Sequence, residues 1–289
     1  MPDVTLPESG RTPAENAQLA LLLEVAGTPK PGNVDRHRDH ADLHFEHFLA
    51  GAVGARVGLE MAADGAPVGE AFETAVEGMA RQSGGNTQFG CLLLLVPLVR
   101  AAAADACTPA GVTDVVEATT VDDAVGFYRA FDHVDVAVDH PPSDAPALDV
   151  RRGGDAAPAL RERGVTLSDV MDRSVPGDGD AAEWVGGFER TFRAADAIVA
   201  DDGPLTDRAA RAYLDLLAEE SDTFVATTHG AAAAEWVRDR AAALRDRDPP
   251  PRDVEGFGDA LVAKGVNPGT TADLTCAALF VALERGVAP

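Results

Sequence analysis

Cysteine and long apolar runs are scarce in this chain of 289 residues, and each scarcity excludes a class of protein. The three cysteines, Cys91, Cys107 and Cys276, lie far apart without a CxxC pair, which argues against a disulfide framework or a zinc ribbon. The longest uncharged apolar run, residues 89–99, is too short to span a bilayer. The polar, acidic residues 1–10 do not resemble a secretory signal. These absences predict a soluble, reduced, cytoplasmic protein.

Positive charge is also in short supply. The chain has 48 acidic and 24 basic residues, which gives a formal net charge of -24. Nucleic acids and anionic membranes are bound by basic surfaces, so we expect neither as a partner. Lys30 and Lys264 are the only lysines, and arginine supplies the remaining basic residues. An acidic, lysine-poor composition favours a halophilic protein, because strong salt screens the repulsion. GC-rich codon usage is the alternative explanation.

Hydrophobic spacing predicts helices along most of the chain. Helix-start signals occur at Thr12-Pro13, Thr108-Pro109 and Thr120, and residues 89–104 are apolar nearly all round. Further helical stretches are expected at residues 12–26, 43–61, 68–81, 181–200, 207–219, 223–245, 254–263 and 271–285. The pattern is lost in residues 133–164, where Pro, Gly and Asp predict an irregular excursion. We therefore expect an all-α, single-domain bundle of roughly ten helices over residues 1–289.

A loop rich in proline and glycine, residues 28–39, is the first candidate site. Two prolines stiffen it around Lys30, whose compact ammonium suits phosphate binding, and Gly32 permits close approach to a ligand. Carboxylate, guanidinium and imidazole groups follow closely in Asp35, Arg36, Asp39, His40 and Asp42. The alternative is a solvated acidic turn in which Asp39 caps the next helix.

Four of the seven histidines, His37, His40, His44 and His47, lie together in the sequence. Three of them have helical spacing and could share one face with Asp42, so a zinc site is conceivable. No HExxH pattern accompanies them. One catalytic or orienting histidine is the favoured interpretation. His229 is a weaker candidate elsewhere in the chain, with ordinary packing as the alternative.

Two further segments depart from simple helix packing. In residues 83–90, the amides of Gly84 and Gly85 can face an anion, and Asn86 and Thr87 add neutral donors. Helix capping explains such a turn equally well. Residues 263–274 hold Lys264, a Pro-Gly turn, Thr271 and Asp273. Asp273 is either a capping residue or a magnesium ligand, because one or two carboxylates plus substrate phosphates usually hold Mg²⁺.

Four of these segments together resemble the triphosphoribosyl-dephospho-CoA synthase family. The family's PKPG-[LN]-VDR loop, H-x-D-M step, TGG-x-NTHKG turn and PGG-x-ADLL stretch correspond to residues 29–36, 40–43, 83–90 and 267–274. Their order and approximate spacing fit across most of the chain. The resemblance implies an all-helical enzyme that joins ATP to 3′-dephospho-CoA. Adenine leaves C1′ of the ATP ribose, and the 2′-OH of the acceptor takes its place.

The resemblance also assigns roles to residues. Asp35 and Asp42, supported by His40, would be catalytic, and Asp42 and Asp273 would hold Mg²⁺. ATP would be held by Lys30, Gly32, Arg36, Gly84, Gly85, Asn86, Thr87, Lys264 and Thr271.

The chain departs from the family pattern at Gln88 and Phe89, where the family has His and Lys, and at Thr270-Thr271. These departures suggest a changed acceptor or a different phosphoribosyl-type reaction in coenzyme biosynthesis. Two further hypotheses are a nucleotide N-glycosidase or hydrolase, and a noncatalytic nucleotide-binding protein. A homodimer is possible.

Overall fold

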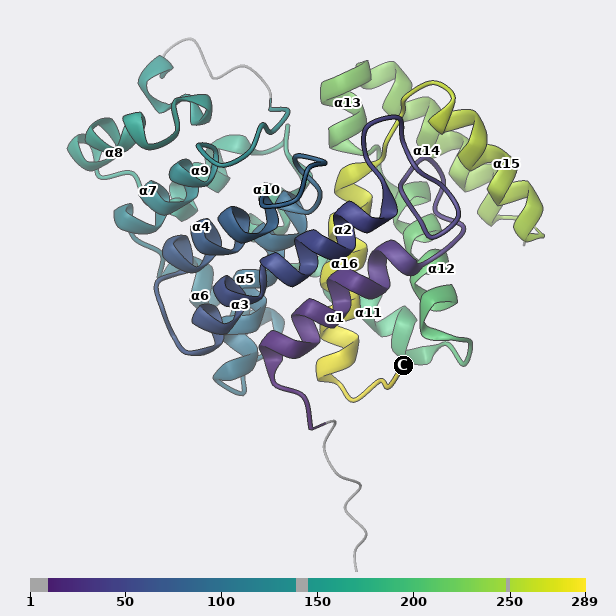
Figure 1. Cartoon of the computed structure of the whole chain (residues 1–289), viewed down its shortest axis with the longest axis horizontal. Helices are drawn as coiled ribbons and strands as arrows, with labels where there is room; N and C mark the ends of the chain where they lie inside the picture. Colours follow the sequence, from purple (N-terminus) through teal and green to yellow (C-terminus); the bar gives the residue numbers. More distant parts are fainter. Residues whose placement is uncertain (1–9, 139–144, 248–249) are drawn as a thin grey trace, which may run out of the picture.

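A computed structural model describes residues 10–138, 145–247 and 250–289, which form sixteen α-helices and two 3₁₀ segments without a β-strand (Figure 1). The helices before residue 131 are α1 (Pro13–Ala26), α2 (Phe45–Gly54), α3 (Arg56–Ala63), α4 (Val68–Met79), α5 (Phe89–Ala103), α6 (Pro109–Glu117) and α7 (Val121–Ala130). Then follow η1 (Pro146–Leu148), η2 (Val150–Ala156), α8 (Ala157–Arg163), α9 (Leu167–Ser174), α10 (Gly179–Val185), α11 (Glu189–Ala200), α12 (Leu205–Glu219), α13 (Thr223–His229), α14 (Ala231–Arg245), α15 (Pro251–Val262) and α16 (Gly269–Glu284).

The all-α class is confirmed, but the expected number of helices was too low. Three stretches that the periodicity joined are each two helices, broken at Ala55, at residues 186–188 and at Gly230. Phe188 and Gly230 have φ values of 61° and 88°, which no α-helix accommodates. Because both helices of each pair bury apolar residues in the protein interior, the apolar pattern continues across the break.

The excursion expected at residues 133–164 is wrong in its second half. Residues 150–163 form η2 and α8. Pro141 and Pro142 lie outside the described residues, as do residues 1–9. The helix expected at residues 43–61 begins at Phe45, and Asp39 Oδ1 accepts a hydrogen bond from the Phe45 amide (2.8 Å), as a residue that caps this helix would.

Local helix-start signals are confirmed. Thr12 accepts from the Glu15 amide and Glu15 returns the contact, so a complete capping box starts α1. Thr120 and Asp123 form a second capping box at α7, and the Thr108 side-chain oxygen accepts from the Gly111 amide at the start of α6. These helix starts could be predicted from the sequence because each cap depends on residues within one turn.

The central helix of the fold is α16, which is buried on nearly every side. It packs against α1, α5, α11 and α12, and in Figure 1 it runs between α7–α9 on one side and α13–α15 on the other. A large apolar core surrounds α5 and α16, and a smaller one joins α12, α14 and α15. Gly90, Asp180 and Asp273, near the starts of α5, α10 and α16, therefore come together beside the core. Within the described parts of the chain, every helix is too short or too polar to cross a membrane.

Candidate active site

A cavity of about 570 Å³ lies where α1, α5, α10, α13 and α16 approach one another. The lining contributed by α7, α9, Phe131 and residues 136–138 and 145–150 is largely apolar, with Phe127 and Met171 among its side chains. The lining contributed by α1, α10 and α16 is polar and acidic. Its ionisable members are Glu24, Asp180 and Asp273. The cavity thus offers both a hydrophobic wall and a cluster of carboxylates.

Two of these carboxylates meet over Gly90, the second residue of α5. A Cβ atom at Gly90 would overlap with Asp273 Oδ2 and lie only 2.5 Å from Asp180 Oδ2. Both oxygens therefore border the small space that the missing side chain leaves open. Glycine is required here for the close approach of two side chains, not for its backbone freedom.

Burial shapes the electrostatics of both aspartates. Asp180 is 8% exposed, and its Oδ1 atom has no hydrogen-bond partner. Burial, followed by the nearby charge of Asp273, holds the pKa of Asp180 well above its ordinary range. Burial likewise raises the pKa of Asp273 well above its usual value, and the Cys91 thiol lies 3.0 Å from Asp273 Oδ1. Both carboxyls are therefore harder to ionise than an exposed aspartate.

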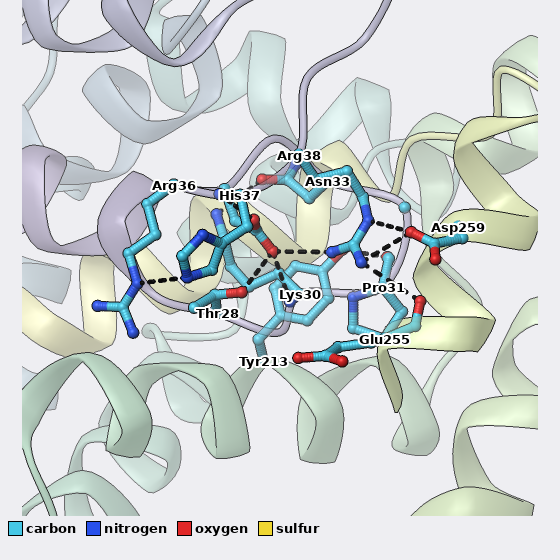
Figure 2. A network of polar contacts seen from close by, with 12 residues as sticks. Thr28, Lys30, Pro31, Asn33, Arg36, His37, Arg38, Tyr213, Glu255 and Asp259 are labelled. Atoms are coloured by element: carbon cyan, nitrogen blue, oxygen red, sulfur yellow. Dashed lines mark hydrogen bonds and ion pairs between the residues drawn. The ribbon is translucent and has the colours of Figure 1, made fainter. Parts of the chain in front are cut away.

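Glu24 reaches the cavity from the last turn of α1 and is held from behind by Lys30. Both side chains are almost completely buried, and Lys30 Nζ forms an ion pair with Glu24 and donates to Asn33 Oδ1 (2.7 Å). Lys30 Nζ also lies 5.8 Å from the centre of the Tyr213 ring (Figure 2). Burial raises the pKa of Glu24, and the Lys30 ammonium offsets part of that rise. Lys30 is therefore a partner of Glu24 and not part of the cavity lining.

Asp35 binds its own loop. Its carboxylate accepts hydrogen bonds from the Thr28 hydroxyl (2.9 Å), the His37 amide (2.8 Å) and Arg38 (3.1 Å). Arg38 continues to Asp259 of α15 (2.8 Å), as Figure 2 shows. This network fastens the proline-rich loop to α15.

Gly32 permits a close approach, but to protein and not to the cavity. It has a φ of 80°, and a Cβ there would lie 2.8 Å from Val266 O and from Pro268 Cδ. His40 Nε2 lies 2.7 Å from Gly32 O, which adds a further restraint on the loop. The loop is therefore packed tightly against the segment that leads into α16.

A match to a known protein family shows which family this chain belongs to. The model of the CitG family, ATP:dephospho-CoA triphosphoribosyl transferase, matches residues 10–288. The chain belongs to this family.

One solved structure supports the fold of this CitG-family chain. It comes from Archaeoglobus fulgidus and is described provisionally as a triphosphoribosyl-dephospho-CoA synthase. The TM-score is 0.68 at 24% sequence identity, and the match covers 82% of this chain and 99% of the other. No curated protein matches the chain significantly.

The structure brings only part of the predicted CitG-family site to the cavity. Asn86, Thr87 and Asp273 line it. The remaining predicted residues are not in the described lining, namely Lys30, Gly32, Asp35, Arg36, His40, Asp42, Gly84, Gly85, Lys264 and Thr271. The Gly-rich turn and the start of α16 thus contribute directly, whereas the proline-rich loop contributes through Asn33 and through Lys30 behind Glu24.

Several of the residues outside the lining have different surroundings. Arg36, Asp42 and Lys264 are exposed, and Arg36 donates to His37 (3.3 Å). Thr271 donates through both its amide (2.8 Å) and its hydroxyl (2.7 Å) to Asp222, which ties α16 to α13. These contacts give Thr271 a positioning role at the start of α16.

The histidines do not assemble around a metal in the part of the chain that the structure describes. The rings of His44 and His47 stack at 5.2 Å, and His229 Nε2 lies 3.0 Å from Gly265 O. No group of three or more His, Cys, Asp or Glu side chains that could hold a metal ion occurs among the described residues. Thr223, Phe224 and Thr227 of the same helix line the cavity, whereas His229 is not among the lining residues.

Sequence reasoning missed Glu24, Asp180 and Arg173, all of which line the cavity. Glu24 interrupts the apolar run of residues 19–26, and a carboxylate inside an apolar stripe is a signal of a buried polar site. Asp180 lies three residues after the Pro176-Gly177 pair and has the sequence surroundings of an ordinary helix-start residue. Nothing local distinguishes Arg173 from the remaining arginines.

Proposed function

We propose that the protein transfers the triphosphoribosyl group of ATP to the 2′-OH of 3′-dephospho-CoA or of a related acceptor. The observation that carries the proposal is the convergence of Glu24, Asp180 and Asp273 in one cavity of a CitG-family chain. The N9–C1′ bond of ATP breaks with its electron pair passing to adenine, and a bond forms between C1′ and the acceptor oxygen. The acceptor proton leaves that oxygen, and adenine N9 gains a proton, so the reaction balances.

Carboxylates suit this chemistry in two ways. Cleavage of the ribosyl C–N bond develops positive charge on the sugar ring, and a fixed carboxylate stabilises that charge. A carboxylate with a raised pKa can also take the proton of the acceptor hydroxyl. We assign these two roles to the set Glu24, Asp180 and Asp273, because all three line the cavity. A catalytic role for Asp35, His40 and Asp42 stays a prediction, and the contacts of Asp35 and His40 favour support of the loop.

Magnesium dependence is part of the proposal. ATP and dephospho-CoA are both polyanions, and the acidic wall would repel them without added positive charge. The carboxylate oxygens of the cavity are the ligand type that Mg²⁺ prefers. Bound magnesium would neutralise phosphate charge and so allow the substrates to lie beside this wall. Arg173 of α9, an exposed member of the lining, adds a cationic side chain.

The second candidate is transfer to a different acceptor, and Phe89 favours it. The ring of Phe89 lies 5.1 Å from Phe72 and 5.0 Å from Phe131, and it lines the cavity where the family pattern has a lysine. Gln88 is buried and replaces a histidine. The wall formed by α5 and α7 is therefore uncharged, which suits an acceptor with an apolar or neutral portion at this place.

The test is incubation of the purified protein with ATP, Mg²⁺ and dephospho-CoA in about molar KCl, which screens the net charge. Chromatography should show free adenine, and mass spectrometry should show dephospho-CoA carrying the triphosphoribosyl group. Release of adenine without an acceptor would favour a hydrolase. Formation of only ADP or AMP would reject transfer at C1′.

Single substitutions test the assignment of residues. Asp273→Asn should abolish adenine release while the chain remains folded by circular dichroism. Asp42→Asn separates the two hypotheses, because loss of activity would favour the sequence-based assignment. The exposed Asp172→Asn on α9 is the matched control for a change of one charge.

A further inference from the structure

Asp180 is the one described cavity carboxylate with a buried oxygen that lacks a partner. Its Oδ1 atom has no hydrogen bond, although the residue is only 8% exposed. An unpaired buried carboxylate oxygen is costly, and native proteins supply a donor or a cation for it. The missing partner therefore points to a ligand that completes the site.

The remaining buried carboxylates nearby already have protein donors. Glu24 is held by Lys30, and Asp222 accepts from the Thr271 amide and hydroxyl and from the Val225 amide. Asp273 has the Cys91 thiol at 3.0 Å. Asp180 is the exception, because its Oδ1 atom has neither a donor nor a cation, while its Oδ2 atom lies with Asp273 Oδ2 beside Gly90.

The phosphate groups of a substrate cannot neutralise the negative charge of Asp180 and Asp273, because they are themselves anionic. Two ionised carboxylates this close together in a buried site repel each other strongly. A phosphate placed against them would be repelled by both. The described lining has a single cationic side chain, Arg173, and it comes from α9 and not from the elements that carry the aspartates.

We infer that Asp180 and Asp273 form a divalent-cation site across Gly90, which binds Mg²⁺ or Mn²⁺ and is completed by a substrate phosphate. Hard divalent cations take carboxylate oxygens, and Mg²⁺ usually keeps waters and substrate phosphates alongside one or two carboxylates. Two protein ligands therefore suffice, which agrees with the lack of a three-residue metal cluster among the described residues. The inference rests on the proposed function only for the identity of the phosphate-bearing ligand.

The pair differs from the one expected from sequence, in which Asp42 joins Asp273. Asp42 is exposed and does not appear in the described lining, whereas Asp180 and Asp273 both lie against the same glycine. The site requires glycine at position 90, because any side chain there would occupy the space between the two carboxylates.

Binding of Mn²⁺ can be measured at this site independently of catalytic activity. In titrations of the full chain with Mn²⁺ and ATP, followed by electron paramagnetic resonance, we expect saturable binding that excess Mg²⁺ competes away. Asp180→Asn, Asp273→Asn and Gly90→Ala should each weaken binding at least about tenfold, which corresponds to about 1.4 kcal/mol. Asp172→Asn should leave it unchanged, and circular dichroism should show that every variant is folded.

The outcomes separate the competing assignments. Weakened binding in Asp42→Asn together with normal binding in Asp180→Asn would overturn the inference. Anomalous scattering from Mn²⁺-soaked crystals of the unaltered protein gives an independent test, since a peak away from Asp180 and Asp273 would also overturn it. Binding at these residues without adenine release would leave the metal site standing and reject the proposed function.

Discussion

Substitution of Lys30 distinguishes most clearly between a structural role and a substrate-binding role for this residue. Its side chain is completely buried, pairs with Glu24 and donates to Asn33. Lys30→Met keeps a similar volume but removes the charge. The Glu24 carboxylate is then left buried without its partner. We expect a large loss of stability from this change, and not a selective loss of ATP affinity.

The magnitude follows from the burial of both partners. Removal of one member of a buried ion pair costs about 3–5 kcal/mol. At about 2.1 cal/mol/K of unfolding entropy per residue, a chain of 289 residues would lose about 5–8 °C in Tm. The double variant Lys30→Met/Glu24→Leu removes both charges, so it should recover most of that loss.

The pH dependence supplies a second, independent signature. Burial already raises the pKa of Glu24 above 4.5, and loss of Lys30 raises it further. A carboxyl with a raised pKa in the folded state binds its proton more tightly there than in the unfolded chain, so stability falls as pH rises towards the folded-state pKa. The deficit of Lys30→Met should therefore be larger at pH 8 than at pH 5.

Thermal unfolding followed by circular dichroism in KCl at the two pH values measures these effects, with the KM for ATP determined in parallel. A Tm equal to that of the unaltered protein, combined with a raised KM, would refute the buried-pair reasoning and favour direct phosphate binding by Lys30. A deficit that is the same at pH 5 and pH 8 would show that Glu24 is not the group left unpaired.

Three further predictions follow from the site and its supports. Arg173→Gln should raise the KM for ATP or dephospho-CoA about tenfold or more, because a hydrogen bond to a charged group contributes about 1.5–3 kcal/mol. Arg173→Lys should raise the KM less, and the exposed Arg163→Gln should have the steady-state kinetics of the unaltered protein. Asp35→Asn should cost about 1–3 kcal/mol in urea unfolding and speed hydrogen exchange in residues 28–38, because Arg38 loses its buried partner; unchanged exchange would contradict the role of Asp35 in holding the loop. Asp180→Asn should stabilise the chelator-treated protein at pH 8 by about 1.4 kcal/mol for each unit by which the Asp180 pKa is raised, and the gain should vanish near pH 3, where the carboxyl is protonated in both states.

The sequence by itself determined the features that depend on near neighbours. The capping boxes of α1 and α7, the buried character of α5 and the all-α class follow from side chains within a few turns of one another. The ordered motifs also indicated the family before the fold was known. Helix breaks such as the one at Phe188 were not predicted from the sequence, because the apolar period continues on both sides of the break.

Only the tertiary structure decided which charged residues share the cavity. Lys30 and Asp35 stand in the most distinctive motif, yet the fold turns Lys30 towards Glu24 and Asp35 towards its own loop. Asp180 looked like an ordinary helix-start residue until the packing of α10 and α16 on Gly90 brought it to Asp273. A one-dimensional pattern specifies the chemistry of each side chain, but the direction in which it points depends on how distant helices pack.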